Sequence, residues 1–261
     1  MPLLCANLMY MFTELPPMQR FKAAAEAGFR LVEYQFPYDL DATQLKRVLD
    51  DNGLRMALIN APSGDRSNGE RGLAALPGRI DDFRDSILLA LAYARELQCP
   101  RIHVMAGIVD DDEREIATAT YAENLRVAAQ TAGAAGIGIV IEPINGIDVP
   151  GYLLQWTAQA RAMIAMIGEQ NILLQYDAYH ALMNEEDPME GLRANLDVIA
   201  HIQIAGYPGR AEPIAEGCYD MGAFIELADM LGYSGAIGCE YNPANGTLAG
   251  LHWASRYGIG V

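Results

Sequence analysis

Short apolar segments alternate with longer amphipathic segments along the whole chain. The apolar segments have the length of buried β-strands, and the amphipathic segments repeat their apolar residues at helical spacing. The pattern predicts eight strands, at residues 3–8, 31–34, 55–60, 101–105, 138–142, 172–177, 200–204 and 236–240. It also predicts helices between them, including 16–29, 42–54, 78–99 and 121–136, several of which end at a glycine suited to a helix C-terminus.

Strand and helix follow each other in strict order, which is typical of a parallel sheet covered by helices. Eight such units predict that the sheet closes, giving an α/β fold, the (β/α)8 TIM barrel with a parallel eight-stranded sheet. No linker or low-complexity segment interrupts the alternation. The 261 residues are therefore expected to form a single domain, 1–261.

The charge of the chain narrows the choice of partner. With 34 acidic and 18 basic residues the formal charge is −16, which repels a phosphate backbone, so no nucleic acid is expected to bind. No apolar run is long enough to span a membrane, and the first residues lack a signal-peptide pattern, so a cytoplasmic protein is expected. Reduced thiols are expected for the four cysteines, Cys5, Cys99, Cys218 and Cys239, which show no paired spacing.

Polar residues end four of the predicted strands. They are Glu142, Asp177, Gln203 and Glu240, each about one βα repeat from the next. In a parallel barrel these strand ends meet at one face, where the active site lies. Three carboxylates gathered in a partly dry site repel one another unless a cation compensates them, and oxygen ligands favour a hard ion. The pattern therefore predicts one divalent metal, Mg²⁺ or Mn²⁺.

Several longer motifs surround these residues. They are NLMYMFTE from Asn7, LPGR ending at Arg79, HVMAG from His103, IEPIN around Glu142, QYDAYH around Asp177, HIQIAGYPGR around Gln203 and GCEYNP around Glu240. In order and length they resemble the hydroxypyruvate isomerase branch of the xylose-isomerase-like barrels, over almost the whole chain. This branch also contains 2-oxo-tetronate isomerases and is related to ketose 3-epimerases.

The resemblance assigns roles to the strand-end residues. It implies that Glu142, Asp177, Gln203 and Glu240 bind the metal, and that Glu142 and Glu240 also act as catalytic acid and base. It implies substrate contacts for His180, three residues after Asp177, and for Arg210. A homodimer is plausible on the same ground.

Other polar residues could have either a functional or a structural role. His103, at the end of the fourth predicted strand, is a candidate substrate contact or a core histidine. Arg210 is the first candidate partner for a substrate carboxylate, whereas Arg71 and Arg79, in the long loop 61–79, are runners-up with a simpler structural reading. His201 is expected at the start of the seventh strand, at the opposite barrel face, with a structural role.

The implied reaction interconverts hydroxypyruvate and tartronate semialdehyde, small oxo and hydroxy acids. These molecules differ by exchange of a carbonyl and a hydroxyl between C2 and C3, so an enediolate is the natural shared intermediate. The resemblance implies a histidine where the chain has Ala211, a lysine where it has Asn242 and a GEINYP-like segment where it has AEGCYDM, all beside the expected pocket. A 2-oxo-tetronate isomerase, a ketose 3-epimerase, a lyase, and a sugar-acid-binding barrel without turnover therefore stay open as alternatives.

Overall fold

The computed structural model describes residues 3–214 and 219–260, and within them eight parallel strands close into a barrel in sequence order. The strands are β1 (Leu3–Asn7), β2 (Leu31–Glu33), β3 (Arg55–Asn60), β4 (Arg101–His103), β5 (Gly138–Ile141), β6 (Ile172–Asp177), β7 (Ile199–Ile204) and β8 (Ala236–Cys239). The last strand pairs with the first, with Leu3 beside Ala236. The predicted TIM barrel is confirmed, with strands at the expected positions.

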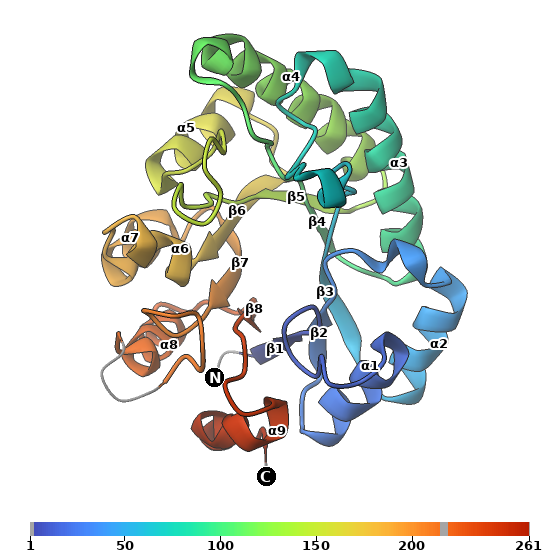
Figure 1. Ribbon diagram of the computed structural model, residues 1–261, viewed down its shortest axis with the longest axis vertical. Helices are drawn as coiled ribbons and strands as arrows, with labels where there is room; N and C mark the ends of the chain where they lie inside the picture. Colours follow the sequence, from blue (N-terminus) through green and yellow to red (C-terminus); the bar gives the residue numbers. More distant parts are fainter. Residues whose placement is uncertain (1–2, 215–218, 261) are drawn as a thin grey trace.

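Helices surround the ring of strands (Figure 1). The described α-helices are α1 (Pro17–Glu26), α2 (Ala42–Asp51), α3 (Ile80–Glu96), α4 (Arg114–Gly133), α5 (Thr157–Ile167), α6 (Ala178–Met183), α7 (Pro188–Asn195), α8 (Met221–Met230) and α9 (Thr247–Gly250). Short 3₁₀ turns are η1 (Pro37–Asp39), η2 (Arg66–Asn68), η3 (Pro77–Arg79), η4 (Asp111–Glu113) and η5 (Leu251–Tyr257). None of the helices in the described ranges is long and apolar enough to cross a membrane.

Local sequence signals set several helix ends. Asp41 precedes α2 and its side chain accepts a hydrogen bond from the backbone N–H of Gln44, which satisfies a donor that the helix leaves free. Proline at position 17 begins α1, where its missing N–H costs nothing. Gly168 ends α5 with a φ of 74°, a left-handed conformation that favours glycine. These signals determine where α1 and α2 begin and where α5 ends.

The barrel interior is built in layers of different polarity. At the amino ends of the strands, Cys5, Leu31, Ala57 and Ala236 form a small apolar cluster. Two residues further along their strands lie Asn7, Glu33 and Gly238, because side chains in a strand alternate between its two faces. The second layer is polar, unlike the branched apolar filling usual in such barrels.

Glu33 is the centre of this polar layer and is fully buried. Its Oε1 accepts hydrogen bonds from Nδ2 of Asn7 and Nε2 of Gln203, both at 2.8 Å, and its Oε2 lies 2.6 Å from Nε2 of His201. Gly238 leaves the space for this carboxylate, since a Cβ there would lie 2.6 Å from Oε1 of Glu33. The polar layer supports the strand ends above it.

Two expectations need comment at this point. His201 is the third residue of β7 and lies in the polar layer beside Glu33, so its placement at the opposite barrel face was wrong. Because β7 begins at Ile199, before the expected first residue, His201 lies further from the amino end of the strand than expected. Cys5, Cys99 and Cys239 are buried free thiols, as expected, and Cys218 lies outside the described residues.

Candidate active site

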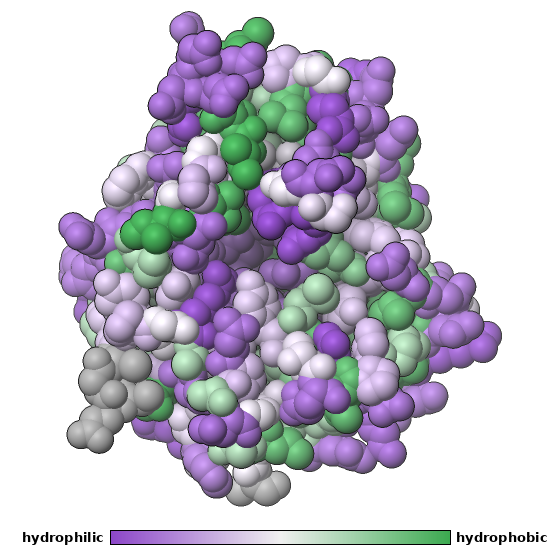
Figure 2. Space-filling model, viewed as in Figure 1, coloured by the Kyte–Doolittle hydropathy of each residue, from purple (hydrophilic) through white to green (hydrophobic). Residues whose placement is uncertain are grey.

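A cavity of about 120 Å³ opens among the carboxyl ends of the strands, and Figure 2 shows a hydrophilic hollow in the middle of this face. Its wall contains the predicted residues His103, Glu142, His180, Arg210 and Glu240. Pockets for drug-sized ligands measure roughly 300–1,000 Å³, so a cavity of this size suits a substrate of few atoms.

A larger hollow of about 430 Å³ lies at the other end of the barrel, beside the first residues of several strands, such as Leu3 and Arg101. Its one lining carboxylate among the described residues, Asp50, is in an ion pair with Lys46. This hollow lacks the convergent acidic groups that proton transfer or metal binding requires. The smaller cavity is therefore the candidate active site.

Glu142 and Glu240 each follow the last residue of a strand, β5 and β8, and both are buried. Burial, reinforced by the charges of Glu240 and Asp177, raises the pKa of Glu142 well above its usual value. Burial also raises the pKa of Glu240 to about 8, against the opposing charge of Arg210. Carboxyl groups shifted toward neutrality are suited to proton transfer, because a catalytic pKa near the working pH is the most effective.

The Glu240 carboxylate is held by several donors. Its Oε2 accepts hydrogen bonds from the side-chain amides of Asn7 at 2.8 Å, Gln35 at 3.1 Å and Gln203 at 2.5 Å. Its Oε1 accepts one from Arg210 at 2.6 Å. These donors come from four different parts of the chain, so the position of Glu240 is set by the closed barrel.

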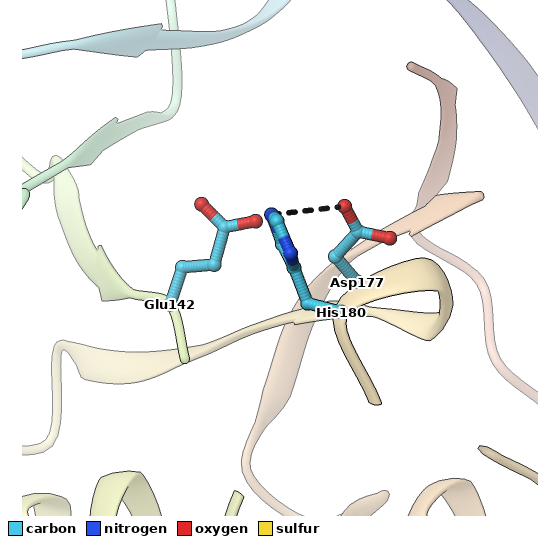
Figure 3. Close-up of side chains that lie close together, drawn as sticks. All are labelled: Glu142, Asp177 and His180. Atoms are coloured by element: carbon cyan, nitrogen blue, oxygen red, sulfur yellow. Dashed lines mark ion pairs between the residues drawn. The ribbon is translucent and has the colours of Figure 1, made fainter. Parts of the chain in front are cut away.

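Asp177 is the last residue of β6 and the N-cap of α6. Its Oδ1 accepts a hydrogen bond from the backbone N–H of Tyr179 at 2.8 Å, which turns Oδ2 toward the site. Oδ2 is buried without a hydrogen-bond partner and lies 3.7 Å from Nε2 of His180 (Figure 3). A buried carboxylate oxygen without a donor is costly, which indicates that a ligand completes this site.

The protonation of His180 follows from its neighbour Asn145. The Asn145 side-chain oxygen accepts the backbone N–H groups of Ile147 and Asp148, so its Nδ2 must face Nδ1 of His180, 2.6 Å away. Nδ1 therefore accepts this bond, and Nε2 carries the proton of the neutral ring. Burial lowers the pKa of His180 to about 3, which keeps the ring neutral at pH 7. His180 thus directs an N–H donor at the site.

Arg210 lies in the loop after β7 in a left-handed backbone conformation, with a φ of 53°. The backbone N–H of Arg210 donates a hydrogen bond to the carbonyl of Gly206, and the backbone N–H of Gly206 donates one to the carbonyl of Ala211, both at 2.8 Å. The guanidinium carbon lies 4.8 Å from the ring centre of Tyr179 and 5.2 Å from that of Tyr10. Backbone strain held by surrounding contacts is a feature of functional sites.

The charge of Arg210 is directed at the carboxylates of the protein. Its guanidinium lies 2.6 Å from Glu240, 3.6 Å from Asp177 and 3.6 Å from Asp148. It thereby offsets part of the repulsion between these buried groups. The predicted substrate contact of Arg210 stays a prediction, and the structure gives this side chain protein partners.

His103 is the last residue of β4, and its Nδ1 lies 3.6 Å from Oε2 of Glu142. Neither ring nitrogen has a hydrogen-bond partner in the described part of the chain, although the side chain is buried. Burial lowers the pKa of His103 to about 3, so the ring is neutral. The structure places it on the cavity wall beside Glu142, with both nitrogens free to bond a ligand.

Gln203 lies next to the other predicted ligands, with its amide turned away from them. Its Nε2 donates to Glu33 and Glu240, and its oxygen accepts a hydrogen bond from Gln175 at 2.6 Å. In this arrangement the side chain supports Glu240 instead of presenting an oxygen to the cavity. Its role as a metal ligand stays a prediction.

Ligand atoms of Glu142, Asp177 and His180 lie within 4.8 Å of one another and can hold a metal ion (Figure 3). His180 is better suited to donate a hydrogen bond than to bind the metal. Binding a metal at Nε2 would move the ring proton to Nδ1, where it would face the amide hydrogens of Asn145. The carboxylates, including the unpartnered Oδ2 of Asp177, fit a hard divalent cation.

Several site residues escaped the sequence analysis. Gln175 lies two positions before Asp177 on the same face of β6, so strand alternation could have found it. Gln35 lies two positions after Glu33, just beyond the end of β2. Asp148 comes from a loop without periodicity, and no local signal marks it.

Known proteins resemble the chain over nearly its whole length. A 2-oxo-tetronate isomerase of Cupriavidus necator is 48% identical over 259 residues, which cover 98% of this chain and 99% of that protein. The hydroxypyruvate isomerase of Escherichia coli is 42% identical over 255 residues, with 97% and 98% covered. A crystal structure from Brucella melitensis, described as an AP endonuclease of family 2, superposes with a TM-score of 0.96 at 39% identity, covering 98% of this chain and 99% of that one.

The profile of the xylose isomerase-like TIM barrel family matches residues 21–257. This match includes the predicted site residues at the strand ends, which are His103, Glu142, Asp177, Gln203 and Glu240. Relatives named as isomerases over almost the full length confirm the predicted enzyme class. The chain therefore belongs to the xylose isomerase-like TIM barrel family, the superfamily that its strand-end motifs predicted.

Proposed function

We propose that this protein is a metal-dependent isomerase that acts on a short 2-oxo acid. The reaction exchanges the carbonyl group at C2 of this acid with the hydroxyl group at C3. The observation that carries the proposal is the pair of buried glutamates, Glu142 and Glu240, on the wall of one small cavity. Both have a raised pKa, and such an exchange needs one group to take a proton and one to give it. The isomerase relatives support the same reaction class.

The proton steps can be written for any acid of this class. One glutamate removes the proton from C3, which leaves an enediolate shared by C2 and C3. The other glutamate delivers a proton to C2, while the proton of the C3 hydroxyl passes to the C2 oxygen. Stereochemistry at C3 decides which of Glu142 and Glu240 acts as the base.

Neighbouring side chains prepare the cavity for this charge. The Nε2–H of His180 donates a hydrogen bond to a substrate oxygen on which negative charge develops, as donors in an oxyanion hole do. Asn7, Gln35 and Gln203 keep Glu240 in position, so no reorganisation is needed during the reaction. Because the site is buried, these interactions are stronger than they would be in water.

We assign one divalent ion, Mg²⁺ or Mn²⁺, to Glu142, Asp177 and Glu240, with Gln203 as the predicted fourth ligand. The clustered carboxylates of Glu142 and Asp177, with the unpartnered Oδ2 of Asp177, support a hard ion, and Glu240 and Gln203 complete the set as predicted oxygen ligands. When bound, the ion supplies Lewis-acid stabilisation of the negative charge on the substrate oxygens.

Two substrates fit the reaction, hydroxypyruvate with three carbons and 2-oxo-tetronate with four. Each has a C2 carbonyl between a carboxylate and a C3 that carries a hydroxyl group. Identity to the 2-oxo-tetronate isomerase is 48%, against 42% to the hydroxypyruvate isomerase, so we place the four-carbon acid first. A DNA substrate is not supported, because a formal charge of −16 opposes it.

Proton NMR in D₂O tests the proposal. The Mg²⁺-supplemented protein is incubated with 2-oxo-tetronate or hydroxypyruvate, beside the variants Glu142→Gln and Glu240→Gln. Glu226→Gln is the matched control, because Glu226 pairs with Arg256 on the surface. We expect the 3-oxo isomer with solvent deuterium incorporated, a loss of at least about 1,000-fold in rate in both site variants, and an unchanged rate in the control.

The outcomes separate the candidate functions. Faster turnover of hydroxypyruvate than of 2-oxo-tetronate would make hydroxypyruvate the preferred substrate and leave the proposed reaction unchanged. Turnover of neutral ketoses alone would replace the proposal with a ketose 3-epimerase. Binding of the acids without deuterium exchange, with Mg²⁺ and Mn²⁺ both tried, would indicate a sugar-acid-binding barrel.

A further inference from the structure

The loop between β3 and α3 is internally braced. Asp65 accepts hydrogen bonds from the backbone of Ser67 and Asn68, which fixes the turn η2. Glu70 accepts the backbone N–H of Asp65 and forms an ion pair with Arg79. A segment with this many internal contacts holds its side chains at defined positions.

The same loop is joined to the next strand end at Gly72. This residue forms an isolated β-bridge with Ala106, and its φ is 128°. A Cβ on Gly72 would lie 2.5 Å from the carbonyl oxygen of Met105 and 2.6 Å from the nitrogen of Gly107. Only glycine permits this approach, which brings the loop against the rim of the cavity.

Two arginines of the loop, Arg66 and Arg71, line the active-site cavity. The guanidinium of Arg66 lies 4.3 Å from the ring centre of Phe36. Nη1 of Arg71 donates hydrogen bonds to the backbone carbonyls of Glu70 at 2.9 Å and Arg66 at 3.3 Å. Arg66 and Arg71 are therefore held in place by an aromatic ring and by backbone carbonyls, which carry no negative charge to neutralise the guanidinium groups.

No carboxylate in residues 3–214 and 219–260 forms an ion pair with either arginine. The third arginine of the loop, Arg79, differs in this respect, since Glu70 and Asp82 neutralise it. Arg210, the remaining arginine on the cavity wall, is engaged by Glu240 and Asp177. The cavity wall thus has two arginines, both from one loop, that have no ion-pair partner in the described part of the chain.

We propose that Arg66 and Arg71 form the subsite that binds the carboxylate of the substrate. This inference rests on the proposed function, because it concerns the acid group that separates oxo acids from neutral ketoses. A guanidinium pairs with a carboxylate through charge-assisted hydrogen bonds, and two guanidinium groups satisfy both oxygens. The loop therefore selects acids, while the strand ends carry out the isomerisation.

Kinetics with matched acid and neutral substrates test the selectivity. The acids are 2-oxo-tetronate and hydroxypyruvate, and their neutral counterparts, erythrulose and dihydroxyacetone, carry a hydroxymethyl group in place of the carboxylate. The variants are Arg66→Gln, Arg71→Gln, the double variant and Arg71→Lys, with Arg84→Gln as control, because Arg84 lies on the exposed side of α3.

We expect each Gln variant to lose roughly 10- to 100-fold in kcat/KM for the acid, mainly through KM, and to keep its value for the neutral substrate. The lysine variant should recover part of the loss, and the control should match the original protein. Equal losses for acid and neutral substrates, or no loss in the double variant, would overturn the carboxylate subsite.

A binding measurement separates this inference from the proposed function. Isothermal titration calorimetry with glycerate and with glycerol, in Mg²⁺ buffer, needs no turnover. Glycerate binding that weakens at least about 10-fold in the double variant supports the subsite even if no oxo acid is isomerised. Equal glycerate affinity in the original protein and the double variant, or no glycerate binding by a protein that isomerises an oxo acid, contradicts it.

Discussion

Oε1 of Glu240 lies 2.6 Å from the guanidinium of Arg210, and the same guanidinium lies 3.6 Å from Oδ2 of Asp177. The two carboxylates come from different strand ends and the arginine from the loop after β7. Arg210 is therefore a cation of the protein itself that offsets the repulsion between these buried acids when no metal ion is bound. This relationship has a direct consequence for stability.

Replacement of Arg210 by methionine should destabilise the protein by about 3 kcal/mol, because it leaves buried carboxylates without their partner. Urea unfolding at pH 7 in the presence of EDTA measures this change. The double variant Arg210→Met/Glu240→Gln should be more stable than the sum of the two single changes implies. Strictly additive effects would show that the ion pair does not couple the two residues.

Addition of Mg²⁺ or Mn²⁺ should raise the Tm by roughly 5 °C at about 100-fold excess over the Kd. The variant Asp177→Asn should lose this increase and keep the helix cap, because an asparagine oxygen can replace Oδ1. Asp187→Asn changes the N-cap of α7 in the same way, away from the cavity, and should keep the metal effect. Thermal unfolding of the three proteins with and without metal decides the matter.

Gly238→Ala should destabilise the protein by about 2 kcal/mol and lower kcat, because the new Cβ would lie 2.6 Å from a carboxylate oxygen of Glu33. Glu33 cannot move freely, since Asn7, His201 and Gln203 all bond to it. Gly138→Ala is the control: it lies at the start of β5, where the nearest atoms are 3.7 Å away. If both variants unfold at the same urea concentration, the space around Glu33 is not restricted.

Stability should decrease in alkaline solution partly through Cys99. Burial raises the pKa of this thiol to about 12 in the folded protein, whereas an unfolded thiol titrates near about 8.5. Between these values the unfolded state binds fewer protons, so the stability contribution present below pH 8.5 is lost as pH rises, at about 1.4 kcal/mol per pH unit. Cys99→Ala should therefore show a shallower decrease from pH 9 to 10.5.

Ile102→Val provides the comparison for Cys99→Ala, because it weakens the same region of the core without removing a titrating group. Its free energy of unfolding should be lower at every pH, with the slope of the original protein. Parallel slopes for all three proteins would show that the Cys99 thiol does not contribute. Urea titrations at four or five pH values are sufficient.

Local patterns were enough for the fold and for the neighbourhood of the site. Glu142, Asp177 and Glu240 ended apolar segments, and a parallel barrel brings such residues to one face whatever their side chains do. His103 was placed near the cavity by the same reasoning and His180 by the family resemblance, and both line the cavity. The loop 61–79 was recognised as unusual by its length, but its arginines could not be ranked, because the presence or absence of an ion-pair partner depends on loop side-chain directions that show no periodicity.

The sequence by itself determined the barrel and the four polar strand ends, because strand alternation and helix periodicity are local patterns that recur in every βα unit. Its longer motifs, by their resemblance to known barrels, indicated the family. Only the tertiary structure decided which charges are paired. It placed Arg210 beside Glu240, 30 residues further along the chain, and His201 beside Glu33, 168 residues away. Such pairings depend on the closure of the barrel, since burial makes an unpaired charge costly and thereby selects the neighbour that compensates it.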